Sequence, residues 1–122
     1  MHFRLELFVD DLQRSIRFYE EILGFAFSKK NETSAMVKLE DFALLLTRDH
    51  ILDKNHYLKK GGFNPKGKGV EVIIVFDNIE QLYQHVLEKD YPVESNLKTQ
   101  SWGMKDFRIV DPDGYYLRLT SY

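Results

Sequence analysis

The sequence predicts an α+β fold of two tandem βαβββ modules, whose curved mixed sheets form a cleft with the helices outside. Two segments 67 positions apart follow one plan, with alternating apolar residues, an aspartate-containing turn and an amphipathic stretch, at residues 5–24 and again at residues 72–90. Several short strand-like runs follow each segment. Such a repeated period indicates an internal duplication. We therefore expect equivalent strands of the two modules to face each other across the cleft.

In the first module, residues 4–9 alternate with period two, which predicts a strand. Asp10 or Asp11 can cap the helix that follows, and Gly24 offers the left-handed conformation that ends it. The apolar stripe expected on the buried side of this helix is Leu12, Ile16, Tyr19, Ile22 and Leu23. Three further strands are predicted, at residues 25–29, 35–39 and 42–47.

The second module repeats this scheme. A strand is predicted at residues 70–76, and Asn78 is expected to cap a helix that ends before Tyr91-Pro92. The predicted buried side of that helix is Ile79, Leu82, Tyr83, Val86 and Leu87. Strands should follow at residues 93–97, 105–110 and 115–121, with a hairpin turn at Asp111-Pro112-Asp113-Gly114 between the last two.

The length of 122 residues fits a single domain. Module 1 spans about residues 1–48, a linker loop about 49–69, and module 2 about 70–122. The linker is rich in lysine, glycine and proline, so we expect it to be mobile and solvated. Aromatic residues make up 14% of the chain, which fits either a core rich in large rings or an aromatic-lined pocket.

Composition excludes several classes of site and partner. The net charge of −2 favours neither nucleic acid nor an anionic membrane as the partner. The absence of cysteine rules out disulfides, thiol nucleophiles and zinc–thiolate sites. No apolar run of roughly 18 residues and no signal peptide is present, so a cytoplasmic protein is expected.

Two motifs carry a family resemblance, F-V-D-D-L-Q-R-S-I-R-F-Y-E-E-I-L-G-F at residues 8–25 and W-G-M-K-D-F-R-I-V-D-P-D-G-Y-Y-L-R-L at residues 102–119. Together they resemble the vicinal oxygen chelate superfamily, which includes glyoxalase I, extradiol dioxygenases, fosfomycin-modifying enzymes and bleomycin-resistance proteins. The Trp102-Gly103 sequence is most similar to the metal-free bleomycin-resistance branch, which confers antibiotic resistance. The resemblance implies a homodimer with two equivalent pockets.

In the enzymes of this superfamily, four inward-facing strand positions hold a divalent metal. The resemblance places these positions at Arg4, Leu45, Glu71 and Arg118. A metal ion needs several carboxylates or neutral imidazoles at once, whereas this set offers one carboxylate, two guanidiniums and a leucine. We therefore expect no metal and no cofactor, and the residues argue against glyoxalase I or dioxygenase activity.

Arg4, Glu71 and Arg118 are instead expected to form a charged cluster at the bottom of the cleft. Arginine presents a rigid fork of donors, so Glu71 can be held by either guanidinium. The spare donors then suit a ligand carboxylate or carbonyl, unless Glu6, on the face of Arg4, neutralises them. A purely structural salt bridge in place of a lost metal is the alternative.

Four other residues complete the predicted ligand site. By strand parity, Phe8 shares the face of Arg4, and Tyr116 shares the face of Arg118; Leu45 occupies one of the mapped positions. The resemblance places Trp102 at the cleft mouth, where its ring would stack on a flat ligand; a plug in the core is the alternative.

Three functions follow from these residues. The first is a metal-free small-molecule binding protein that sequesters an aromatic or amphiphilic compound. The second is a metal-dependent lyase, transferase or dioxygenase with atypical ligands such as His2, Glu6 and Glu71. The third is a degenerate member with a regulatory or structural role. The four mapped positions favour a binding protein over an enzyme, and the sequence does not name the ligand.

Overall fold

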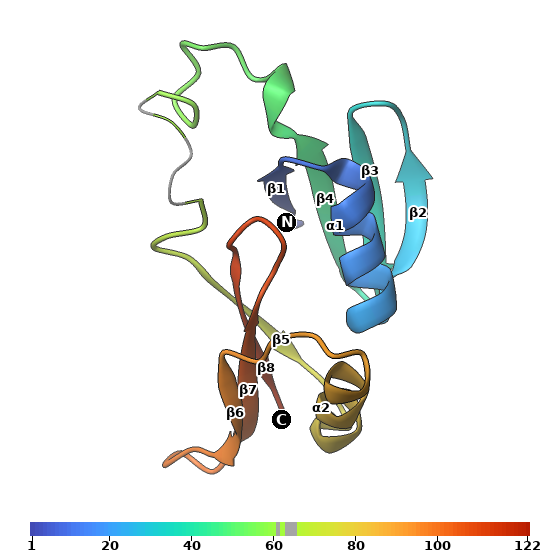
Figure 1. Ribbon diagram of the computed structural model, residues 1–122, viewed down its shortest axis with the longest axis vertical. Helices are drawn as coiled ribbons and strands as arrows, with labels where there is room; N and C mark the ends of the chain where they lie inside the picture. The colour runs from blue at the N-terminus through green and yellow to red at the C-terminus, as the bar shows by residue number, and fades with distance from the viewer. Residues whose placement is uncertain (61, 63–65) are drawn as a thin grey trace. The chain divides into compact units, whose positions relative to one another are not determined.

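The computed structural model describes residues 1–60, 62 and 66–122 of the chain (Figure 1). The chain divides into two compact units, Met1–Asn64 and Pro65–Tyr122. The first unit contains β1 (Leu5–Val9), α1 (Leu12–Arg17), β2 (Ala26–Lys30), β3 (Ser34–Leu39) and β4 (Phe42–Arg48). The second contains β5 (Glu71–Val75), α2 (Ile79–Glu88), β6 (Ser95–Thr99), β7 (Lys105–Val110) and β8 (Tyr116–Thr120). The predicted α+β class and both βαβββ modules are confirmed.

The two sheets have the same topology. Sheet A has the strand order β1-β4-β3-β2, and sheet B has the order β5-β8-β7-β6. In each sheet the first strand pairs in parallel with the last, and the remaining pairs are antiparallel. The register is also repeated. Glu6 and Ile73 are equivalent positions, 67 residues apart, and they lie opposite Leu45 in sheet A and Arg118 in sheet B. The structure defines each unit by itself, so the predicted cleft stays a prediction.

The core of the first unit lies between sheet A and the helix that packs on β3 and β4. The predicted apolar stripe is confirmed, since all five of its residues are buried. The helix differs in one respect: α1 ends at Arg17 and continues as a π-helical turn, Phe18–Ile22. This turn buries the Phe18 ring edge-on against Tyr19, with 4.8 Å between the ring centroids. Gly24 ends the segment at φ +81°, as predicted.

In the second unit, α2 packs against β7, and the rings of Tyr83 and Phe107 meet edge-to-face at 4.9 Å. Asn78 caps α2 as predicted, because its side chain accepts a hydrogen bond of 3.1 Å from the backbone N–H of Gln81. The prediction that Leu87 is buried is wrong, since its side chain is 41% exposed. Val86 lies in the core instead. Successive side chains of a helix point about 100° apart, so the next residue, Leu87, points away from the core.

Strand β6 begins two residues later than predicted, at Ser95. The backbone N–H of Glu94 already bonds to the carbonyl of Arg108, but the ladder with β7 is irregular between Ser95 and Lys98. The predicted hairpin turn between β7 and β8 is confirmed. Asp111 Oδ1 accepts 2.9 Å hydrogen bonds from the backbone N–H groups of Asp113 and Tyr115, and Gly114 has φ +102°.

The predicted linker at residues 49–69 begins with a 3-10 turn, Asp49–Ile51, and its residues 61 and 63–65 lie outside the described residues. One of its lysines, Lys66, is not solvated as expected, whereas Lys68 and Gly69 are exposed. Lys66 Nζ lies 3.4 Å from Asp113 Oδ1, and these side chains are only 11% and 2% exposed. The linker therefore joins the second unit at the β7–β8 turn. Within the described residues, no helix has the length and apolar character needed to cross a membrane.

Candidate functional site

Sheet B has one face packed under α2 and a second face that no helix of the described second unit covers. Strand alternation and register place Phe107, Leu117 and Leu119 on the packed face, where they are fully buried. The side chains of β5, β8 and β7 that point away from α2 form what we call the open face of sheet B. They are Glu71, Ile73 and Val75 of β5, Tyr116, Arg118 and Thr120 of β8, and Asp106, Arg108 and Val110 of β7. Apolar and charged residues thus lie together on this face.

A charged cluster occupies the middle of the open face. Glu71 accepts a hydrogen bond of 3.1 Å from Arg108 Nε, and its other oxygen lies 3.7 Å from Arg118 Nη1. Arg108 Nη1 also contacts Asp106 Oδ1 at 3.4 Å. Burial alone would lower the pKa of Arg108, but the hydrogen bond that it donates to Glu71 and the negative charges of Asp106 and Glu71 raise the pKa above its usual value. Arg108 therefore stays charged at neutral pH.

Two polar atoms of this cluster have no hydrogen-bond partner among the described residues. They are Asp106 Oδ2 and Arg118 Nε, and both are buried. The other Asp106 oxygen is well satisfied, because Gln100 Nε2 donates to it at 2.7 Å. Buried polar groups are normally paired, so one unused acceptor and one unused donor on the same face suggest a site for a further polar molecule.

Tyr116 borders the cluster on β8. Its hydroxyl donates to Glu94 Oε2 at 2.5 Å. Burial, followed by the hydrogen bond and the negative charge of Glu94, raises the pKa of Tyr116 to about 12. The phenol is therefore a firmly protonated donor at physiological pH.

This shifted pKa predicts a loss of stability in alkaline solution. The Tyr116 phenol ionises near pH 10.0 in the unfolded chain and near pH 12 in the folded chain, so its contribution is complete below pH 10.0 and is lost between the two values. We expect the urea midpoint to fall more steeply in the wild type than in Tyr116→Phe from about pH 10 upward. Equal slopes for the two proteins would contradict the assignment.

The structure brings together three of the predicted site residues, namely Glu71, Tyr116 and Arg118. Trp102 lies in the turn between β6 and β7, and it is 55% exposed. The core-plug alternative for Trp102 is therefore wrong for the described chain. Its predicted stacking role stays a prediction.

The other predicted residues belong to the first unit. Arg4 is exposed and precedes β1, so its contact with Glu71 stays a prediction. Phe8 and Leu45 are half-buried on sheet A, and Leu45 lines a hollow of about 480 Å³ with Ser34 and Met36. Glu6 accepts a 2.7 Å hydrogen bond from the Thr47 hydroxyl, a neutral donor that leaves its charge uncompensated, so its role beside Arg4 stays a prediction.

Sequence reasoning missed three members of the cluster: Gln100, Asp106 and Arg108. A signal for Arg108 was present, because Phe107 and Ile109 alternate as apolar residues in the predicted strand 105–110 and leave Arg108 on the opposite face. The register confirms that Arg108 lies directly opposite Arg118. No sequence signal marked Gln100. It follows the last residue of β6, and the β6–β7 turn brings its side chain within hydrogen-bonding distance of Asp106.

The divalent metal implied by the family resemblance does not fit these residues. In the part of the chain that the structure describes, no three His, Cys, Asp or Glu side chains are grouped to hold a metal ion. Glu71 stands between two guanidiniums, which repel a cation.

Comparisons with known proteins agree with the fold. The family model "Glyoxalase/Bleomycin resistance protein/Dioxygenase superfamily" matches residues 2–119. Bleomycin resistance proteins from Geobacillus stearothermophilus and Staphylococcus aureus are 27% identical, with 86% of this chain and 84% of theirs covered.

Solved structures show the same fold. TioX from Micromonospora sp. ML1 has a TM-score of 0.83 at 15% identity, covering 99% of this chain and 98% of its own. Lactoylglutathione lyase from Agrobacterium tumefaciens has a TM-score of 0.77 at 19% identity, covering 99% and 92%. With the matching family model and the repeated βαβββ topology, this chain belongs to the glyoxalase/bleomycin resistance protein/dioxygenase superfamily.

Proposed function

We propose that this protein is a metal-free binding protein that sequesters an aromatic or amphiphilic small molecule, as the name of its bleomycin resistance relatives suggests. The observation that carries the proposal is the open face of sheet B. It combines a charged cluster that keeps an unused donor and an unused acceptor with apolar neighbours, Ile73 and Val75, which are 48% and 42% exposed. Ligand sites typically pair apolar surface with a few well-placed polar groups.

The residues have separate roles in this proposal. Arg118 donates to a carbonyl or carboxylate of the ligand, and Asp106 accepts from a ligand N–H or O–H. Trp102 supplies a stacking surface, since an exposed ring needs little reordering to cover a flat ligand. Arg4, Phe8 and Leu45 belong to the proposed site as contributions from sheet A.

A homodimer is part of the same proposal. A second copy of the chain would close over the open face of sheet B and over the ligand bound there, and would cover Ile73 and Val75 as well. The metal-dependent lyase or dioxygenase is the less favoured candidate, because Glu71 stands between two guanidiniums that repel a cation.

Fluorescence tests the proposal directly, because Trp102 is the only tryptophan. We expect bleomycin, or another flat aromatic compound with a carbonyl or carboxylate, to quench Trp102 emission with saturation. Arg118→Met should weaken binding roughly tenfold or more, since a buried charged hydrogen bond is lost. Trp102→Ala should weaken binding of the same compound about fivefold, and calorimetry measures this affinity because the variant has no tryptophan emission.

The matched control is Arg17→Met, which removes an exposed arginine from the end of α1 and should leave affinity unchanged. If a broad panel of such compounds leaves both emission and heat unaltered, the binding function is wrong. If Arg118→Met and Arg17→Met bind equally well, the cluster is a structural salt bridge and the ligand lies elsewhere.

A further inference from the structure

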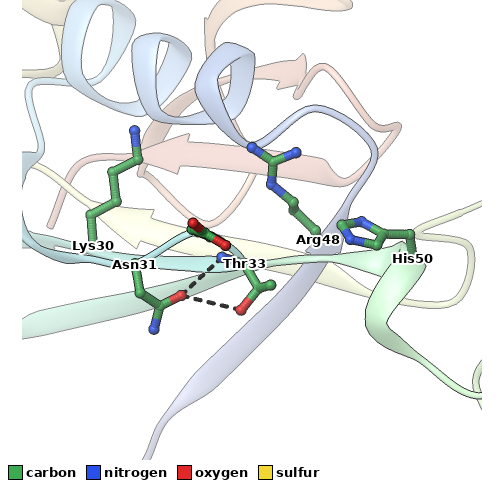
Figure 2. Close-up of a pocket in the computed structure, with 6 residues that line it drawn as sticks. Lys30, Asn31, Thr33, Arg48 and His50 are labelled. Carbon is green, nitrogen blue, oxygen red and sulfur yellow. Dashed lines mark hydrogen bonds between the residues drawn. The ribbon is translucent and has the colours of Figure 1, made fainter.

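A second hollow lies at the edge of sheet A, separate from the open face of sheet B. It has a volume of about 690 Å³, within the range of small-molecule sites. The β2–β3 turn and the end of β4 form its walls. A hydrogen bond of 2.7 Å from the backbone N–H of Arg48 to the carbonyl of Thr33 ties these two segments together. The lining residues are Lys30, Asn31, Glu32, Thr33, Arg48 and His50 (Figure 2).

Arg48 is the informative residue of this hollow. Its side chain is half-buried, and its Nε is buried with no hydrogen-bond partner. Across the described residues, the Arg48 guanidinium forms neither a hydrogen bond nor an ion pair. Withdrawing a charge from water without a partner is costly, so a guanidinium held in this way is short of an anion. Its forked donors suit a phosphate or carboxylate.

The remaining charges of the hollow favour the same kind of ligand. Lys30 Nζ donates to Gln13 Oε1 at 2.8 Å, and this neutral acceptor leaves the lysine charge uncompensated. Lys30 and Arg48 face a single lining carboxylate, Glu32, so the lining carries one excess positive charge. In Figure 2 the side chains of Lys30 and Arg48 extend to the same side, whereas Asn31 points the opposite way.

The turn that carries Lys30 is held in one conformation. Asn31 Oδ1 accepts hydrogen bonds of 2.9 Å from the backbone N–H groups of Thr33 and Ser34, and another of 3.1 Å from the Thr33 hydroxyl. The wall opposite Arg48 is therefore fixed before any ligand arrives, which reduces the entropy lost on binding.

We propose that this hollow binds the phosphate or carboxylate group of a small anionic ligand, with Arg48 as the principal contact and Lys30 as the second cation. Asp49, which follows Arg48 in the chain, is engaged in an interaction of its own. The site uses none of the residues of the open face of sheet B, although Lys30 and Asn31 also line the neighbouring hollow of Leu45.

Nuclear magnetic resonance on ¹⁵N-labelled protein tests this inference. Inorganic phosphate and benzoate are titrated separately at constant ionic strength. We expect saturable amide shifts confined to residues 30–34 and 48–50 with at least one of the two anions. Arg48→Met should weaken binding on the order of tenfold, Arg48→Lys less, and Lys30→Met a few-fold. Lys38→Met, which removes an exposed lysine of β3 outside the hollow, should bind as the wild type does.

The two anions separate the possible ligand sources. Saturation by phosphate alone indicates a phosphorylated ligand, and saturation by benzoate alone indicates a carboxylic acid. If neither anion gives saturable shifts at these amides, or if Lys38→Met weakens binding as much as Lys30→Met, the inference is wrong. Should Arg48→Met fail to fold, as its own spectrum reports, Arg48→Lys and Lys30→Met decide the question.

Discussion

Replacing Phe107 with alanine is expected to lower the free energy of unfolding by roughly 3–5 kcal/mol. The ring is fully buried and packs edge-to-face on Tyr83, so its removal loses apolar burial, an aromatic contact and the filling of the core between β7 and α2. Urea unfolding followed by far-UV circular dichroism measures the change.

Trp102→Ala is the matched control for Phe107→Ala, since it removes an aromatic ring of the same unit that is 55% exposed. Its effect on stability should stay within about 0.5 kcal/mol. A similar loss in both variants would mean that Trp102 is covered in the native protein, for example by a second copy of the chain. No loss in Phe107→Ala would contradict the core described for the second unit.

Gly67→Ala should be nearly as damaging, for a different reason. Gly67 has φ +84°, and a Cβ there would lie 2.6 Å from the carbonyl oxygen of Gly114 and 2.9 Å from Tyr115 Cα. The left-handed conformation costs about 1–2 kcal/mol with a side chain, and forcing the two backbones apart adds roughly 1–3 kcal/mol. Thermal unfolding should therefore show a large drop in melting temperature.

Gly69→Ala separates the two costs of the Gly67 substitution. Gly69 has nearly the same backbone conformation, φ +87°, but nothing lies within 4 Å of a Cβ built on it. Only the conformational cost of about 1–2 kcal/mol is expected there. Equal melting temperatures for Gly67→Ala and Gly69→Ala would show that the linker does not press on the β7–β8 turn.

Much of the fold was predictable because its signals are local. Alternation of apolar residues identified the strands, and Asn78 marked the start of α2. The residues Asp111–Gly114 favour a tight turn over any other backbone conformation. The π-helical turn at Phe18–Ile22 was not predictable, because its residues have the same apolar spacing as an ordinary helix. The burial of Lys66 depends on a contact with Asp113, far away in sequence.

The candidate site was predictable only in part. Glu71 and Arg118 were placed by the family resemblance, and the register brings them together because they lie two pairs apart on neighbouring strands, on the same face. Asp106 was missed because an aspartate in a strand usually faces water, and only the tertiary arrangement shows that it is 1% exposed. Its burial follows from cover by Gln100 and Arg108, which no periodicity reveals.

The parallel pairing described in both sheets also sets an order of assembly. The hairpins β2–β3–β4 and β6–β7–β8 join neighbouring strands and can close early, whereas β1 and β5 pair only with the last strand of their sheets. During synthesis, β1 thus leaves the ribosome well before its partner exists, and β5 waits in the same way for β8. Each apolar first strand must stay unpaired until its module is complete, which makes these two segments the natural points for a chaperone to shield the nascent chain.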